Sequence, residues 1–103
     1  MLTFRPERAA DGAVLTVAGE IDMATAESLY EQATTLAASG TRVLVLDLGG
    51  VSFCDSLGVA ALVRIYRHGT GVGYRLRVTN VREHIAHVLQ ISGLDQVFEV
   101  QAG

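Results

Sequence analysis

The sequence predicts a single α/β domain over residues 1–103, with a mostly parallel, mixed sheet of four or five strands. An N-terminal β-hairpin should start this sheet, and the helices should pack on one face. Short apolar runs alternate with longer segments that carry a helical apolar stripe, in the order ββαβαβαβ. The length of 103 residues suits one domain and is too short for two. Right-handed crossovers that step in one direction keep the helices on one side.

The first part of the chain predicts a hairpin followed by a helix. Residues 2–8 form a weak edge strand, and Asp11-Gly12 is a turn that leads into a second strand over residues 13–18. Asp22 is a suitable N-cap, because its carboxylate can accept free amide protons of a first helical turn. The apolar spacing predicts a helix over residues 23–39.

The middle of the chain predicts the central strand and the second helix. Residues 43–48 are apolar and rich in branched side chains, as expected for a strand buried on both faces. Gly49-Gly50 is interpreted as a loop, and a helix begins near Ser56 and continues to Arg67. A glycine-rich loop follows over residues 68–73.

The last third predicts a strand, a helix and a short final strand. Residues 74–79 alternate between apolar and polar side chains, which indicates a strand with one wet face. Asn80 can cap a third helix, whose stripe runs from Val81 to Leu89, and residues 96–100 form the last strand.

Composition excludes several classes of function. A net charge of −3 without a basic stripe argues against nucleic-acid binding. Residues 1–7 lack the order of a signal peptide, and no apolar stretch approaches the roughly 20 residues of a membrane span. A single cysteine, Cys54, fits a reducing compartment. We therefore expect a cytoplasmic protein without membrane insertion.

Ser56 is the residue best placed for chemistry, because it starts a helix beyond the carboxyl end of a central strand. It could be a plain helix cap, a nucleophile or a phosphorylation site. His68 lies a helix length away, and no G-x-S-x-G elbow is present, so we assign no catalytic residue. A phosphate on Ser56 would lie over free helix amides and add charge beside Asp55.

The surface around Ser56 has two interpretations. Val59 and Val63 lie on the Ser56 side of the helix, where they are either buried deeply or form a partner-binding patch. The opposite face is suited to the sheet and consists of Leu57, Ala61, Leu62 and Ile65.

No metal site or cofactor is expected. His84 and His87 lie three residues apart on a helix, and no further ligand accompanies them. Cys54 is either a small packing residue or a redox switch. Asp47 should bond to loop amides at the end of its strand.

Two separated motifs carry a resemblance to a known family. Residues 45–58 follow the pattern V-L-D-L-x-x-V-x-F-x-D-S-x-G, and Gly19-Glu20-Ile21-Asp22 follows G-E-[IL]-D. Both patterns, together with the length and element order, resemble the STAS-domain anti-sigma factor antagonists. The chain departs from many members at Leu57, where a small or hydroxyl residue is common, and at Cys54.

This resemblance implies a bacterial partner switch rather than an enzyme. The unphosphorylated antagonist would bind an anti-sigma factor with serine-kinase activity and so release a sigma factor. Phosphorylation of Ser56 would break this contact, and a phosphatase would restore it. The residues expected at the partner surface are Asp22, Asp55, Ser56, Leu57, Gly58, Val59 and Val63.

Two alternatives remain at this point. The chain could be a STAS adaptor subunit of a membrane transport complex, where no phosphorylation is needed. It could also be a weak nucleotide hydrolase, although it lacks a phosphate loop and a credible base.

Overall fold

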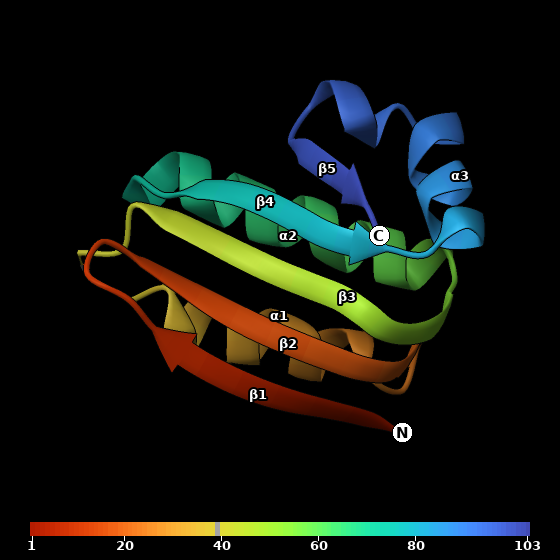
Figure 1. The fold of residues 1–103 in the computed structure, drawn as a ribbon, viewed down its shortest axis with the longest axis horizontal. Helices are drawn as coiled ribbons and strands as arrows, with labels where there is room; N and C mark the ends of the chain where they lie inside the picture. The colour runs from red at the N-terminus through yellow and green to blue at the C-terminus, as the bar shows by residue number, and fades with distance from the viewer. Residues whose placement is uncertain (39) are drawn as a thin grey trace.

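A five-stranded sheet with the strand order β1-β2-β3-β4-β5 organises the chain (Figure 1). The structure is a computed structural model, and it describes residues 1–38 and 40–103. The strands are β1 (Leu2–Arg8), β2 (Gly12–Ile21), β3 (Val43–Cys54), β4 (Arg75–Val81) and β5 (Glu99–Ala102). The helices are α1 (Ala26–Leu36), α2 (Ser56–Val72), α3 (Glu83–Ile91) and the 3₁₀ helix η1 (Leu94–Gln96).

The predicted fold class and element order are confirmed. β1 is antiparallel to β2, and all other neighbouring strands are parallel. Alternate side chains of the central strands, such as Leu15, Leu46 and Val78, have no exposed surface. α1 and α2 cover the face to which these side chains point, whereas the described helices leave the front of β1, β2 and β3 open (Figure 1). The apolar alternation therefore sets which face carries the helices.

The loop predicted at Gly49-Gly50 is wrong, because β3 continues through both glycines to Cys54. A Cβ on Gly50 would lie 2.7 Å from the Cβ of Ala18 on β2, so only glycine lets the two strands stay this close. β2 is also longer than predicted, and its last residue, Ile21, pairs with Cys54. The glycines thus extend the central strand toward Ser56.

The loop predicted over residues 68–73 is mostly helix, since α2 continues to Val72. Gly69 is buried where a Cβ would lie 2.4 Å from the Tyr74 ring, so this glycine serves close packing within the helix. Gly73 ends the helix in the left-handed conformation, with φ of 104°. Two of the glycines in residues 68–73 therefore have specific roles: Gly69 allows close packing against Tyr74, and Gly73 ends the helix.

The predicted cap at Asn80 is also wrong. Asn80 lies within β4 with φ of 56°, a conformation that asparagine tolerates better than most residues. Its side-chain amide donates to Asp47 Oδ2 (2.9 Å), and α3 begins later, after Arg82. The last strand is shifted to Glu99–Ala102, because η1 includes Gln96, the residue expected to start it. The predicted end of the first helix at Ser39 lies outside the described residues.

Candidate functional site

Ser56 is exposed and is the first residue of α2, directly beyond the end of β3. The N-cap is Asp55, whose Oδ1 accepts hydrogen bonds from the amides of Leu57 (2.9 Å) and Gly58 (3.0 Å). A carboxylate in this position satisfies free amides and interacts favourably with the helix dipole. Asp55 therefore fixes the backbone that presents Ser56.

These hydrogen bonds correct one expectation from the sequence. A phosphate on Ser56 was expected to lie over free helix amides, but the Leu57 and Gly58 amides already bond to Asp55. A phosphate would have to compete with this carboxylate or remain in solvent beside it. Either outcome places two anionic groups at one helix terminus, which is unfavourable.

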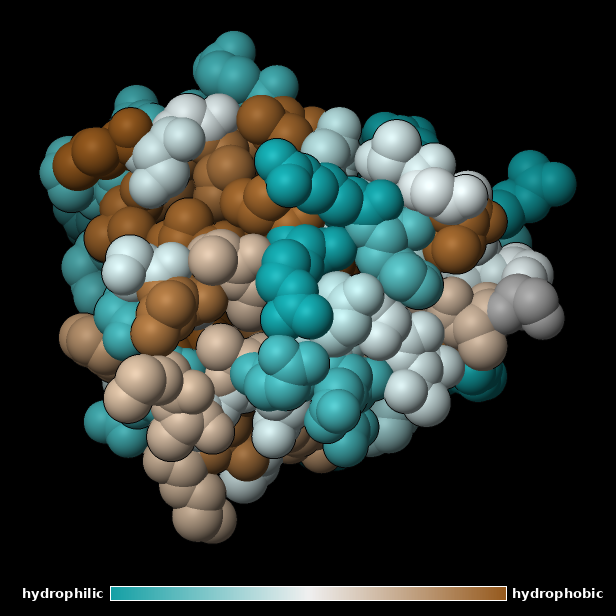
Figure 2. Space-filling model, turned by 180° about the vertical axis from the view of Figure 1, so that it is seen from behind, coloured by the Kyte–Doolittle hydropathy of each residue, from teal (hydrophilic) through white to brown (hydrophobic). Residues whose placement is uncertain are grey.

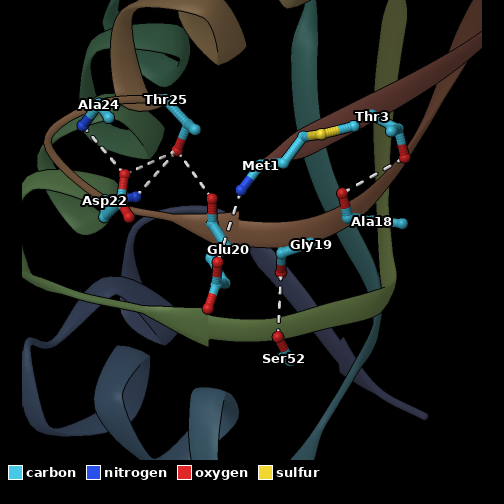
Figure 3. Close-up of polar contacts among 9 residues, drawn as sticks. All are labelled: Met1, Thr3, Ala18, Gly19, Glu20, Asp22, Ala24, Thr25 and Ser52. Carbon is cyan, nitrogen blue, oxygen red and sulfur yellow. Dashed lines mark hydrogen bonds and ion pairs between the residues drawn. The ribbon is translucent and has the colours of Figure 1, made fainter.

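Asp22 caps a turn rather than a helix (Figure 3). Its Oδ1 accepts from the Ala24 amide (2.9 Å), and its backbone oxygen accepts from Ala26 (2.8 Å). The N-cap of α1 is Thr25, so the predicted helix start at Asp22 is displaced by one turn. The Thr25 hydroxyl donates to the Glu20 carbonyl (2.7 Å) and accepts from the Asp22 amide (3.0 Å), which closes this turn.

The two sequence motifs meet at a backbone hydrogen bond. The Asp55 amide donates to the Ile21 carbonyl (3.1 Å), which joins the segment before Ser56 to the segment before Asp22. The Ser52 hydroxyl donates to the Gly19 carbonyl (3.4 Å), which adds a second link nearby (Figure 3). Both predicted carboxylates therefore lie at the carboxyl ends of neighbouring strands, as expected for an open α/β sheet.

Gly58 was expected at the partner surface, but it is buried and offers little surface to a partner. Its neighbours Ser56 and Leu57 are exposed. A Cβ at this position would lie 2.6 Å from Cys54 Sγ and 2.8 Å from Ile21 Cγ2. The first turn of α2 consequently lies directly on β2 and β3. This close contact keeps Ser56 at a fixed place relative to the sheet.

Exposed apolar side chains surround Ser56. Leu57 was expected to face the sheet, but it is 46% exposed, because the turn that starts α2 directs Gly58 inward instead. Phe53 is 49% exposed and Met23, next to Asp22, is 79% exposed. Figure 2 shows hydrophobic surface gathered on the left, at the end where α2 starts and α3 lies.

Met23 and Leu57 also line a shallow groove between α1 and α2, with a volume of about 310 Å³. The other lining residues are Ala26, Glu27, Ala60, Ala61 and Arg64. Val59 and Val63, the residues with two interpretations, pack partly against the core. Both valines are less exposed than Leu57 and Met23, so the apolar surface beside Ser56 centres on Leu57 and Met23.

Two side chains near the start of α3 support the end of β3. β3 pairs with β4 only as far as Asp47, although it continues to Cys54 beside β2. Beyond Asp47, Arg82 Nε donates to the Gly49 carbonyl (3.0 Å), and His84 Nε2 lies 2.9 Å from the Ser52 carbonyl. Sequence reasoning assigned no role to Arg82 or His84, since only the fold shows that β3 extends past β4.

Cys54 is buried, and its burial, followed by the charge of Asp55, raises the thiol pKa from 9.0 to about 11. We expect native protein at pH 8 to react with a thiol reagent roughly a hundredfold more slowly than an exposed cysteine with a pKa of 9.0. The chain has one cysteine, so labelling followed by mass spectrometry measures this site alone.

The same shift predicts a pH dependence of folding. The folded state holds the thiol proton more tightly, so this contribution to the free energy of unfolding is complete below pH 9 and is lost as the pH rises toward about 11.

The labelling experiment also has a contrary outcome. If native protein at pH 8 were labelled as rapidly as protein unfolded in urea, the thiol would not be buried and a redox role would be favoured.

Within residues 1–38 and 40–103, no group of three or more histidine, cysteine or acidic side chains is arranged to hold a metal ion. Asp47 Oδ1 accepts from the Gly49 amide (2.9 Å) as predicted, but Asp47 lies within β3 rather than at its end, and Gly49 is a strand residue rather than a loop residue. In the same described part of the chain, every helix is too short or too polar to span a membrane.

Comparison with known families agrees with this geometry. The family profile described as "Mlab, STAS domain" matches residues 4–100. The chain belongs to the STAS domain family. This assignment confirms the resemblance found in the two motifs, and it places Ser56 at the start of the second helix of a STAS domain.

Two proteins similar to this chain are named anti-sigma factor antagonists. The anti-sigma-B factor antagonist of Bacillus subtilis is 30% identical over 88 residues, which cover 85% of this chain and 80% of that protein. An anti-sigma factor antagonist from Mycobacterium paratuberculosis is 28% identical, with a TM-score of 0.83 over 100% of this chain and 87% of the other.

The antagonist SpoIIAA shares the fold at 23% identity in two states. Its unphosphorylated form superimposes with a TM-score of 0.80 over 98% of this chain and 89% of that chain. Its phosphorylated form gives 0.74 over 98% of this chain and 92% of the other.

Proposed function

We propose that this STAS domain is an anti-sigma factor antagonist controlled by phosphorylation of Ser56. The unphosphorylated chain binds an anti-sigma factor that is also a serine kinase, and a sigma factor is released as a result. Phosphorylation of Ser56 ends the contact, and a phosphatase reverses this step.

The observation that carries the proposal is the exposed Ser56 hydroxyl within an apolar surface. Leu57 follows Ser56 and Phe53 lies three residues before it, both are about half exposed, and Met23 follows Asp22 at the adjoining strand end. Apolar surface of this kind is typical of a protein-binding site. A kinase can reach the hydroxyl, because it lies at the exposed start of a helix.

The chemistry of the site suits loss of binding on phosphorylation. A phosphate adds about −1.5 to −2 charges, and Asp55 already places a carboxylate on the neighbouring residue. A partner that covers Leu57 would have to remove water from both anions, which costs free energy unless cations match them. The named activity of the relatives supports an anti-sigma factor as this partner.

The test compares two Ser56 variants in two steps, capture from lysate and then binding of the purified partner. In the first step, Ser56→Ala and Ser56→Asp proteins serve as baits in native lysate, and captured proteins are identified by mass spectrometry. We expect Ser56→Ala to capture an anti-sigma factor, and Ser56→Asp to bind it at least tenfold more weakly after purification. Incubation of the purified pair with ATP should phosphorylate wild type at Ser56.

Ser28→Asp is the matched control, because Ser28 is an exposed serine on α1 and the charge change is the same. It should bind like wild type. Capture of transporter subunits by both Ser56 variants would instead support the adaptor function. Equal binding of the anti-sigma factor by Ser56→Ala and Ser56→Asp would exclude the phosphorylation switch.

A further inference from the structure

The groove between α1 and α2 is lined by two large apolar side chains and three alanines. Met23, from the turn after β2, is 79% exposed, and Leu57, from the first turn of α2, is 46% exposed. The alanines are Ala26, Ala60 and Ala61, whose small side chains leave the space open. Large apolar side chains that remain exposed beside a hollow are typical of a protein-binding surface.

The charges in the groove are paired with each other. Its two charged lining residues are Glu27 and Arg64, and Arg64 Nη1 donates to Glu27 Oε1 (2.9 Å). The Arg64 guanidinium also lies 4.0 Å from the centroid of the Tyr30 ring, which holds it against α1. An occupant therefore meets apolar surface and a neutralised ion pair. An uncharged apolar side chain suits this lining, whereas an isolated charge would lose water without gaining a partner.

The backbone on both sides of the groove is fixed before a partner binds. The Thr25 hydroxyl bonds to two backbone groups before Met23 and so closes the turn that contains it (Figure 3). On the other side of the groove, Asp55 caps α2 and fixes the backbone at Leu57. The methionine side chain itself is unbranched and adapts to different neighbours. Binding therefore requires little ordering of the backbone, which favours association.

We propose that an apolar side chain of the anti-sigma factor occupies this groove. Its volume of about 310 Å³ lies near the lower limit of small-ligand pockets and suits a side chain of a protein partner. Leu57 lines the groove and directly follows Ser56, so a protein that covers the Ser56 surface also reaches the groove. This contact rests on the proposed function and adds the chemistry of the partner, which carries an exposed leucine, isoleucine, methionine or phenylalanine at this point.

A phosphate on Ser56 would oppose this contact. The phosphate would be attached to the residue before Leu57, so an apolar side chain that enters the groove would have to displace water beside an anion. Among the described residues, Arg64 is the one cation that lines the groove, and it is already paired with Glu27. An apolar groove without a free cation therefore suits a contact that phosphorylation ends.

The test measures whether the anti-sigma factor covers Met23. The chain has two methionines, Met1 and Met23, so protein labelled with carbon-13 at the methionine methyl groups gives two signals. Both side chains are exposed in the free protein, and a soluble nitroxide should relax both signals rapidly. Addition of the purified anti-sigma factor to the Ser56→Ala protein should slow the relaxation of the Met23 methyl group at least threefold. Met23→Leu assigns this signal by removing it.

Substitutions in the groove should weaken binding of the purified anti-sigma factor. In the Ser56→Ala background, Met23→Ser and Ala60→Gln should each raise the dissociation constant roughly fivefold or more, because the apolar side chain then meets a polar one. Met23→Leu keeps the apolar lining and should bind like the parent protein. Val72→Ser and Thr35→Gln are matched controls, because they introduce the same side chains at exposed helix positions outside the groove. Both should bind like the parent protein.

The outcomes distinguish the groove contact from the phosphorylation switch. If the anti-sigma factor binds Ser56→Ala while Met23 stays exposed, or if the groove variants bind like their controls, the groove contact is overturned and the switch stands. If Ser56→Ala captures no anti-sigma factor, both are overturned. If Met23 becomes protected in the free protein as its concentration is raised, a second copy fills the groove, which also overturns the proposed occupant.

Discussion

Alanine at Gly58 is expected to lower the free energy of unfolding by about 2 kcal/mol, because overpacking of a tight contact outweighs the gain in helix propensity. The new methyl group would lie 2.6 Å from Cys54 Sγ and 3.0 Å from the Ile21 carbonyl oxygen. The first turn of α2 would have to move away from the sheet. Urea denaturation followed by circular dichroism measures the change.

Gly71→Ala is the matched control within the same helix. Among the described residues, no atom from elsewhere lies within 4 Å of a Cβ built at Gly71. This variant should gain about 0.5 kcal/mol, because alanine has the higher helix propensity. Equal effects of the two substitutions would show that α2 does not rest on β2 and β3 at Gly58.

Phosphoserine installed at position 56 during synthesis is expected to destabilise the fold by about 1–2 kcal/mol, through repulsion between the phosphate and the Asp55 carboxylate. In an Asp55→Asn background the same modification should stabilise the fold by up to about 1 kcal/mol. Asparagine is a good N-cap without charge, and a phosphate near a helix N-terminus is favourable. Denaturant unfolding of the four proteins gives this comparison.

The sign of the change in the free energy of unfolding is the informative result. It depends on whether the Asp55 carboxylate or the phosphate accepts hydrogen bonds from the Leu57 and Gly58 amides. Asp95→Asn, on η1, removes a carboxylate that lines a groove with Tyr66 and Thr70 in the second half of α2 rather than at its start, and it should leave the destabilisation unchanged. Stabilisation by phosphate in the presence of Asp55 would mean that the carboxylate gives up the cap readily. The measurement requires no kinase, so it is independent of the partner's identity.

Element order and motif placement could be predicted from sequence because they depend on local patterns. The alternation in residues 74–79 and the stripe of α1 each specify which side is buried, and parallel crossovers follow from element order. The second apolar run, which begins near Ser56, predicts the helix start that the structure has at this residue.

The errors fall where a contact distant in sequence decides the local structure. Gly50 and Gly69 were interpreted as loop residues, but they allow close approach to Ala18 and Tyr74. Leu57 was assigned to the buried face because helical periodicity alone cannot reveal that Gly58 fills the contact with the sheet. The prediction at Asn80 used the usual preference of asparagine for helix caps, but Asn80 lies in a strand, where its side chain donates a hydrogen bond to Asp47.

The extension of β3 beyond β4 has a consequence for the dynamics of the site. Between Asp47 and Cys54, one edge of β3 pairs with β2, and the other is tied by the side chains of Arg82 and His84. Single hydrogen bonds of this type contribute about 1 kcal/mol each, far less than global unfolding costs. The backbone groups on the β4-facing edge of this segment can therefore exchange with solvent or with a bound protein at low cost, while the pairing with β2 and the burial of Leu48 and Val51 hold the segment in the sheet.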